Sequence, residues 1–133
     1  MKNRHLALLV TLSLFSIAAA AANFAGEYAD KKFLNGQGVF QLSLEQNGND
    51  VSVFFSAGYN DGHGAAPEAD GSGKVNAKGT VDFTFEDGFK NAGSGTITRT
   101  ADGVIISIKT TRVADPRCLV FYKQNIRLPK LKK

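Results

Sequence analysis

The chain has 133 residues, a formal net charge of +4, one cysteine and no tryptophan. One cysteine excludes an intrachain disulfide, and the length suits a single domain that buries a core of its own. The charge is modest, because two of the cations are Lys2 and Arg4 and five more crowd positions 123–133. This composition argues against a nucleic-acid-binding protein.

Residues 1–22 have the three parts of a secretory signal peptide. Lys2 and Arg4 form a basic start, positions 6–17 are apolar apart from Thr and Ser, and a run of five alanines ends at Ala22. The apolar run is too short for a membrane-spanning helix, and a buried N-terminal helix is the alternative interpretation. We expect cleavage after Ala22 and a mature protein that is periplasmic or secreted.

The clearest hairpin of the chain lies between positions 38 and 57. In the run 40–45 apolar and polar residues alternate, which places one face of a strand in a core and the other in solvent. Asn-Gly at 47–48 favours a tight turn, because both residues readily adopt positive φ. The return run, 51–56, turns Phe55 to the apolar face and Phe54 to the other face.

The segment 58–73 interrupts this alternation, since it is rich in glycine and carboxylates and shows no apolar periodicity. We interpret it as a long loop, and loops of this kind tend to bind partners or to be mobile. Alternation resumes afterwards, and Asp-Gly at 102–103 predicts a second hairpin. Further strands are predicted at 24–28, 74–76, 80–86, 95–100, 104–110 and 118–123.

About eight short strands, separated by turns and without a helical period, predict an all-β fold. Nearly all connections can join neighbouring strands, so we expect an antiparallel up-and-down barrel, with a partly open β-sandwich as the alternative. Closing the barrel would also remove exposed sheet edges. The predicted organisation is a signal peptide at 1–22, a barrel at 23–123 and a basic tail at 124–133.

Gly-Glu-Tyr at 26–28 opens the first strand, and Asp-Gly-Ser-Gly at 70–73 is typical of a turn. In these features and in its strand pattern the mature chain resembles small calycin-type barrels, the lipocalin and avidin-like families. The resemblance implies a meander barrel. Lipocalins usually carry Gly-x-Trp in the first strand, and avidin-like proteins line their biotin pocket with tryptophans. Because this chain has none, their ligand-binding residues do not carry over.

Seven side chains are candidates for ligand binding. They are Tyr59, Asp61, His63, Glu68 and Asp70 of the glycine-rich segment, and Phe55 and Phe83 of the predicted strands. Carboxylates and an imidazole can bind a cation or exchange protons, but their spacing fits no calcium loop and the mature chain offers no second histidine. We therefore expect no metal and no cofactor. An eight-stranded barrel is just wide enough to be filled or to hold one small hydrophobic ligand.

The sequence offers no catalytic residues by motif, because no nucleophile is placed beside a base and an orienting group. Cys118 is interpreted as a buried thiol, since apolar residues follow it and no histidine lies nearby in sequence; an intermolecular bridge is the alternative.

These observations favour an exported binding module that acts on a protein or a small ligand through the 58–73 segment and the barrel mouth, for example as an inhibitor of an exported enzyme. Two alternatives stay open. One is a small hydrolase or isomerase-type enzyme that uses Asp61, His63 and Glu68. The other is an envelope-associated structural protein whose basic tail contacts an anionic surface. We expect a monomer or a dimer and no nucleic-acid partner.

Overall fold

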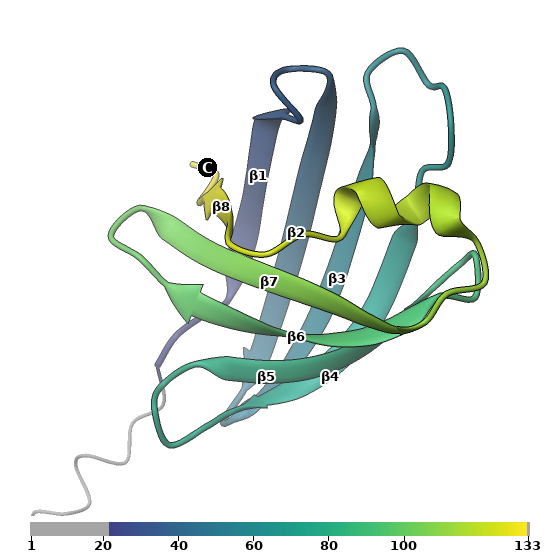
Figure 1. Cartoon of the computed structure of the whole chain (residues 1–133). Helices are drawn as coiled ribbons and strands as arrows, with labels where there is room; N and C mark the ends of the chain where they lie inside the picture. Colours follow the sequence, from purple (N-terminus) through teal and green to yellow (C-terminus); the bar gives the residue numbers. More distant parts are fainter. Residues whose placement is uncertain (1–21, 133) are drawn as a thin grey trace, which may run out of the picture.

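The computed structural model describes residues 22–132, and the predicted signal peptide lies outside them except for Ala22. The described chain forms one antiparallel sheet of eight strands, arranged in sequence order from β1 to β8 (Figure 1). The strands are β1 (Gly26–Phe33), β2 (Gly38–Asn47), β3 (Asp50–Tyr59), β4 (Glu68–Val75), β5 (Val81–Asp87), β6 (Ala92–Arg99), β7 (Gly103–Arg112) and β8 (Ile126–Pro129). A short 3₁₀ helix, η1 (Pro116–Phe121), connects β7 to β8.

The first and last strands meet, so the sheet curls into a nearly closed barrel. Tyr28 of β1 forms a bridge with Lys130 just after β8, and the backbone N–H of Leu131 donates to the carbonyl of Glu27 at 2.8 Å. The predicted up-and-down barrel is confirmed, whereas the sandwich alternative is wrong. Within residues 22–132 no helix is long and apolar enough to cross a membrane.

The β2–β3 hairpin forms at the predicted position, but Gly48 and Asn49, not Asn47 and Gly48, are the central residues of its turn. Asn47 and Asp50 face each other at the turn, and Gly48 takes a φ of +64°. Such a positive φ matches the twist of the two strands and is accessible to glycine without strain. Alternate residues of both strands are buried, as expected for strands with one face in a core.

Two phenylalanines of β5 pack over glycines of the strands on either side. Phe83 lies opposite Gly73 of β4 and Gly95 of β6. Phe85 lies in the same way between Gly71 of β4 and Gly93 of β6. A Cβ added to Gly95 would lie 2.3 Å from the carbonyl oxygen of Ser107 and 2.6 Å from Cζ of Phe83. The missing side chains of β4 and β6 therefore provide the space that the two rings fill.

Aromatic side chains fill the barrel interior. The ring of Phe55, which is 1% exposed, has its centroid 5.6 Å from Phe40, 5.1 Å from Phe85 and 6.0 Å from Tyr122. At the end of the barrel that carries the β1–β2 and β3–β4 connections, η1 inserts Phe121, which is fully buried and packs against Phe33. The interior is thus a packed core with η1 as its plug.

The long loop predicted at 58–73 is wrong in extent. β3 continues to Tyr59 and β4 already begins at Glu68, so only residues 60–67 connect the two strands. The inward positions of β4 are Ala69, Gly71 and Gly73, which face the large rings of β5. A strand whose buried side chains are this small shows no apolar alternation in the sequence, and this explains the error.

The last strand predicted at 118–123 is also wrong, because 116–121 forms η1 and the last strand lies at 126–129. Asp115 caps η1, its side chain accepting a hydrogen bond from the backbone N–H of Arg117, and Pro116 occupies the first turn. Both residues favour a helical start over a strand. Ile126 and Leu128 point into the core, so β8 lies within the range predicted as a basic tail.

Candidate functional site

Three of the predicted site residues come together at the β3–β4 connection. The ring of Tyr59, at the end of β3, stacks on that of His63 with centroids 4.0 Å apart. Asp61 accepts a hydrogen bond from the backbone N–H of His63 at 3.1 Å and also contacts its imidazole Nδ1. This imidazole contact lowers the pKa of Asp61. The three residues, with Gln37 and Asn60, line a shallow depression of about 220 Å³.

The chemistry available in this depression is limited. It holds a base and a carboxylate, but no serine, cysteine or lysine lines it. The groups there that could act as a nucleophile or a base are the side chains of Tyr59, Asp61 and His63. Glu68, the third predicted catalytic residue, lines a different depression. Among the described residues no group of three or more His, Cys, Asp or Glu side chains is placed to hold a metal ion.

Glu68 and Asp70 lie on the outer face of β4, beside an exposed aromatic ring. Phe54 of β3 is 45% exposed and faces Asp70 directly across the strand pair. On its other side it faces Ser43 of β2. We call the surface formed by Ser43, Phe54, Ser56, Glu68 and Asp70 the Phe54 face.

The Phe54 face carries negative charge that the sheet does not neutralise. Asp70 lies directly opposite Glu86 of β5, and like charges in facing positions destabilise a sheet. Arg112 pairs with Glu86 at 3.0 Å, but within residues 22–132 neither Glu68 nor Asp70 forms an ion pair. Phe54 therefore lies next to two carboxylates that are available to a partner.

Two depressions meet at Phe54. One, of about 300 Å³, extends over β1 and β2 and includes Gln41 and Leu131. The other, of about 570 Å³, extends over β4 and β5 and includes Glu68 and Asp70. The ring of Phe54 thus forms a ridge between two hollows, a shape that a complementary protein surface can cover.

The two predicted pocket phenylalanines, Phe55 and Phe83, lie in the core. They are 1% and 3% exposed, and their ring centroids are 6.4 Å apart. The structure does not bring them together with the polar candidates of the β3–β4 connection, since they point to the opposite face of the sheet.

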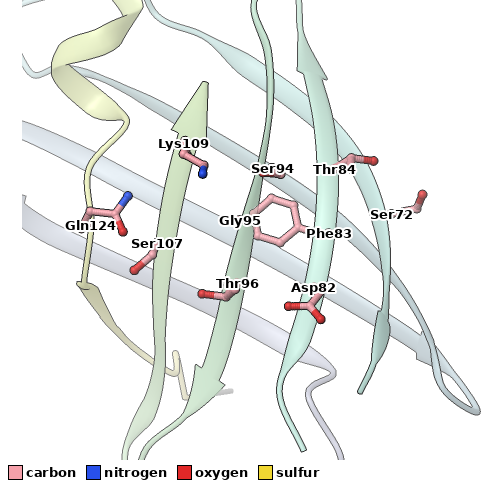
Figure 2. A pocket seen from close by; sticks show the side chains of 10 residues that line it. All are labelled: Ser72, Asp82, Phe83, Thr84, Ser94, Gly95, Thr96, Ser107, Lys109 and Gln124. Carbon is pink, nitrogen blue, oxygen red and sulfur yellow. The ribbon is translucent and has the colours of Figure 1, made fainter. Parts of the chain in front are cut away.

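A separate polar groove of about 520 Å³ runs across the outer face of β4–β7 (Figure 2). Its side chains are mainly short hydroxyls in neighbouring register positions, with Ser72 opposite Thr84 and Thr84 opposite Ser94. Asp82 and Lys109 contribute one charge of each sign, and the amide of Gln124 donates to the carbonyl of Ile108 at 2.9 Å. This composition is typical of a solvated sheet face.

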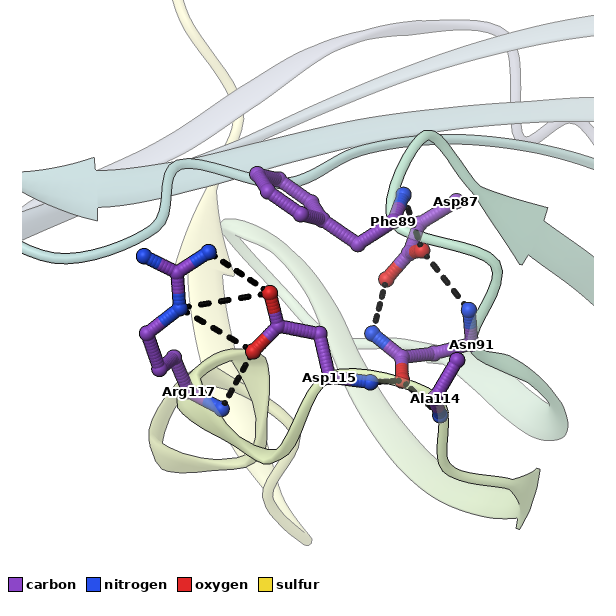
Figure 3. Close-up of polar contacts among 6 residues, drawn as sticks. All are labelled: Asp87, Phe89, Asn91, Ala114, Asp115 and Arg117. Carbon is purple, nitrogen blue, oxygen red and sulfur yellow. Dashed lines mark hydrogen bonds and ion pairs between the residues drawn. The ribbon is translucent and has the colours of Figure 1, made fainter.

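The sequence offered no indication of a buried polar cluster that joins the β5–β6 turn to η1 (Figure 3). Asp87, 5% exposed, accepts hydrogen bonds from the backbone N–H groups of Phe89 and Asn91 at 2.8 and 3.0 Å. Its second oxygen accepts from the amide of Asn91 at 2.9 Å and from the Tyr122 hydroxyl at 2.6 Å. Asn91, which is fully buried, accepts in turn from the backbone N–H groups of Ala114 and Asp115.

Both oxygens of the Asp87 carboxyl group and the amide oxygen of Asn91 thus have hydrogen-bond partners. The cluster therefore holds η1 in place and does not present a reactive group. Desolvation, followed by the hydrogen bond to Asp87, raises the pKa of Tyr122 above its ordinary value. Burial likewise raises the pKa of the Cys118 thiol to about 11, and its side chain is inaccessible to solvent. These groups are held in their neutral forms.

Sequence reasoning missed Phe54 as a site residue. The signal was present, because Phe54 is an aromatic residue at a solvent-facing position between Ser52 and Ser56.

Comparison of the chain with protein-family models, with curated proteins and with solved structures gives no match.

Proposed function

We propose that this protein is an exported β-barrel module that binds another protein through the Phe54 face. The observation that carries the proposal is the position of Phe54, a ring that is 45% exposed between two hollows. It lies beside two carboxylates that form no ion pair within residues 22–132. Exposed aromatic rings surrounded by polar groups are enriched where proteins bind each other.

The packed interior favours a protein partner over a small hydrophobic ligand. Phe55 and Phe83, which a ligand inside the barrel would have to contact, instead contact other aromatic side chains. Phe121 and Tyr122 occupy the mouth of the barrel. Binding is therefore assigned to the outer surface.

Charge complementarity indicates the kind of partner. Glu68 and Asp70 give the Phe54 face a negative charge, which speeds association with a positively charged surface and disfavours acidic partners. We infer a basic protein that this chain meets after export, and inhibition of an exported enzyme is the activity that such binding would produce. Export itself, and a relation to calycin-type barrels beyond the shared strand order, are parts of this proposal.

The test uses two variants that remove an exposed apolar side chain from different places. Phe54→Ser alters the Phe54 face, and Val113→Ser, at a residue that is 46% exposed, alters the connection between β7 and η1. The native protein and both variants are immobilised and exposed to the envelope and medium fractions of the host. We expect a basic protein to bind the native chain and Val113→Ser, and to bind Phe54→Ser at least tenfold more weakly.

Equal binding by Phe54→Ser, with an unchanged melting temperature, would contradict the proposal. A second variant separates the β3–β4 connection from the Phe54 face. Replacing residues 60–67 by Asn-Gly joins the strands in a tight turn and removes Asp61 and His63 while retaining Phe54 and Glu68. If this variant still binds, the partner contacts the Phe54 face alone. If binding is lost, the interface also includes the β3–β4 connection.

A hydrolase or isomerase-type activity is the second candidate, and the contact between Asp61 and His63 is the observation that favours it. The exported protein is assayed against ester, amide and glycoside substrates beside His63→Ala. Turnover that is the same in both proteins would remove His63 from any mechanism and this candidate with it.

A further inference from the structure

We propose a binding site for a phosphate group where the start and the end of the described chain meet. A depression of about 580 Å³ lies there, between Asn23, the β6–β7 turn at 100–103 and the segment 130–132 that follows β8. It shares Tyr28 and Leu131 with the depression that extends from Phe54 over β1 and β2, but its charged residues are different. The inference is independent of the proposed function.

Three cations line this terminal pocket. Arg99 comes from the end of β6, and Lys130 and Lys132 follow β8. All three side chains are exposed. Because they come from two segments separated by about thirty residues in sequence, the fold, and not a run of basic residues, brings them together.

The cations of the terminal pocket lack carboxylate partners. Four ion pairs form within residues 22–132, and none of them includes Arg99, Lys130 or Lys132. The one carboxylate that lines the pocket, Asp102, accepts a hydrogen bond from the Thr100 hydroxyl at 3.1 Å. Three positive charges therefore face one negative charge.

Two of the cations are positioned by the surrounding backbone. The guanidinium of Arg99 lies 6.0 Å from the centroid of the Phe24 ring and donates a hydrogen bond of 3.0 Å to the carbonyl of Asn23. This is its one hydrogen bond within residues 22–132, so its other N–H groups can donate to a ligand. The side chain of Lys130 lies across Gly26, where an added Cβ would be 2.6 Å from Cε of the lysine. Because Gly26 has no side chain, the side chain of Lys130 has room to lie along the pocket.

The charge and number of donors favour phosphate over a carboxylate. A carboxylate presents two oxygens and pairs well with one guanidinium, whereas a phosphate group presents more oxygens and can accept from a guanidinium and two ammonium groups together. The phosphate can belong to a small soluble compound or to the headgroup of an anionic lipid, and the experiment distinguishes these sources.

The test titrates the ¹⁵N-labelled exported protein with inorganic phosphate, and separately measures its sedimentation with vesicles of phosphatidylglycerol and of phosphatidylcholine. Saturable shifts confined to Asn23, 100–103 and 130–132 are expected with phosphate. If the source is a lipid, sedimentation with phosphatidylglycerol vesicles but not with phosphatidylcholine vesicles is expected in place of, or in addition to, these shifts.

Two triple variants make the test specific. Arg99→Gln, Lys130→Gln and Lys132→Gln together remove the proposed ligands, and Lys31→Gln, Lys78→Gln and Lys123→Gln remove equal charge from exposed positions outside the pocket. We expect the first variant to bind at least about tenfold more weakly and the second to bind within about twofold of the native protein. Equal losses in both variants, or no saturable binding of phosphate or phosphatidylglycerol by the native protein, would overturn the inference.

Discussion

The Tyr122 hydroxyl donates a 2.6 Å hydrogen bond to the carboxyl group of Asp87, joining the residue after η1 to the last residue of β5. This bond connects the plug of the barrel to its wall. Asp87 accepts three further hydrogen bonds, all from the turn that follows β5. A single buried carboxyl group thus orders both the β5–β6 turn and the start of the C-terminal segment.

Asp87→Asn is expected to destabilise the protein. The amide would place a donor where Asp87 now accepts from Asn91 and Tyr122, and a buried polar group left without a partner costs about 1–3 kcal/mol. We expect a loss of about 3 kcal/mol in the free energy of unfolding, measured by urea denaturation. Asp82→Asn, at an exposed position of the same strand, is the control and should change it by less than about 0.5 kcal/mol. Similar effects of the two substitutions would refute the role of Asp87.

Stability is expected to fall in alkaline solution because of Tyr122. Its pKa is raised in the folded state, so the unfolded state releases the proton first, and stability that is fully present below pH of about 10 is lost as pH rises further. The slope from one such group is about 1.4 kcal/mol per pH unit. Urea denaturation between about pH 8 and about pH 11, in steps of about half a pH unit, measures this slope.

Tyr122→Phe should reduce this alkaline slope, since phenylalanine has no proton to release. Part of the slope should remain, because burial also raises the pKa of Tyr28 and of Cys118. An identical slope in the native protein and in Tyr122→Phe would show that Tyr122 ionises equally in the folded and unfolded states.

Gly95→Ala is expected to destabilise the protein, although alanine usually stabilises a chain relative to glycine. Its Cβ would lie 2.3 Å from the carbonyl oxygen of Ser107 and 2.6 Å from the Phe83 ring, so β7 or the ring must move. A loss of about 2 kcal/mol is expected from the overpacking. Gly88→Ala is the matched control, because an added Cβ meets nothing within 4 Å there. A neutral result at both positions would mean that β4–β7 accommodate larger side chains than the packing suggests.

Cys118 should react with thiol reagents only when the protein unfolds. Its side chain is fully buried and its pKa is raised to about 11, so at pH of about 8 little thiolate forms and none is accessible. Labelling with a disulfide reagent is expected to be slow in native buffer and complete within minutes in guanidinium chloride. Rapid stoichiometric labelling of the native protein would favour the alternative of a reactive or bridging cysteine.

The elements predicted correctly from the sequence are those whose own side chains reveal their environment. β2, β3 and β5 alternate large apolar with polar residues, and Asn-Gly and Asp-Gly mark the tight turns of two hairpins. β4 was not predicted in full, because its buried positions are Ala69, Gly71 and Gly73 and the apolar volume comes from β5. The strand pattern of β4 can therefore be recognised only together with that of its neighbour β5.

The C-terminal error has a different cause. Cys118–Phe121 has the composition of a strand, but Asp115 and Pro116 start a 3₁₀ helix, and the Asn91 side chain holds the backbone of Ala114 and Asp115 in place. Asn91 lies more than twenty residues earlier, so a local reading of the sequence cannot include it. The contact between Tyr59 and His63, by comparison, lies within five residues and was within reach of local reasoning.

The terminal pocket also bears on how the chain can be connected. Asn23 and Lys132 line the same depression, and the backbone near each is already held to the barrel, through Arg99 at one end and Glu27 at the other. A linker of a few residues can therefore join the two ends. New ends fit best within 60–64, which lies between two strands and is exposed throughout. Such a circular permutant should keep all eight strands in their present order around the barrel while starting its chain at β4.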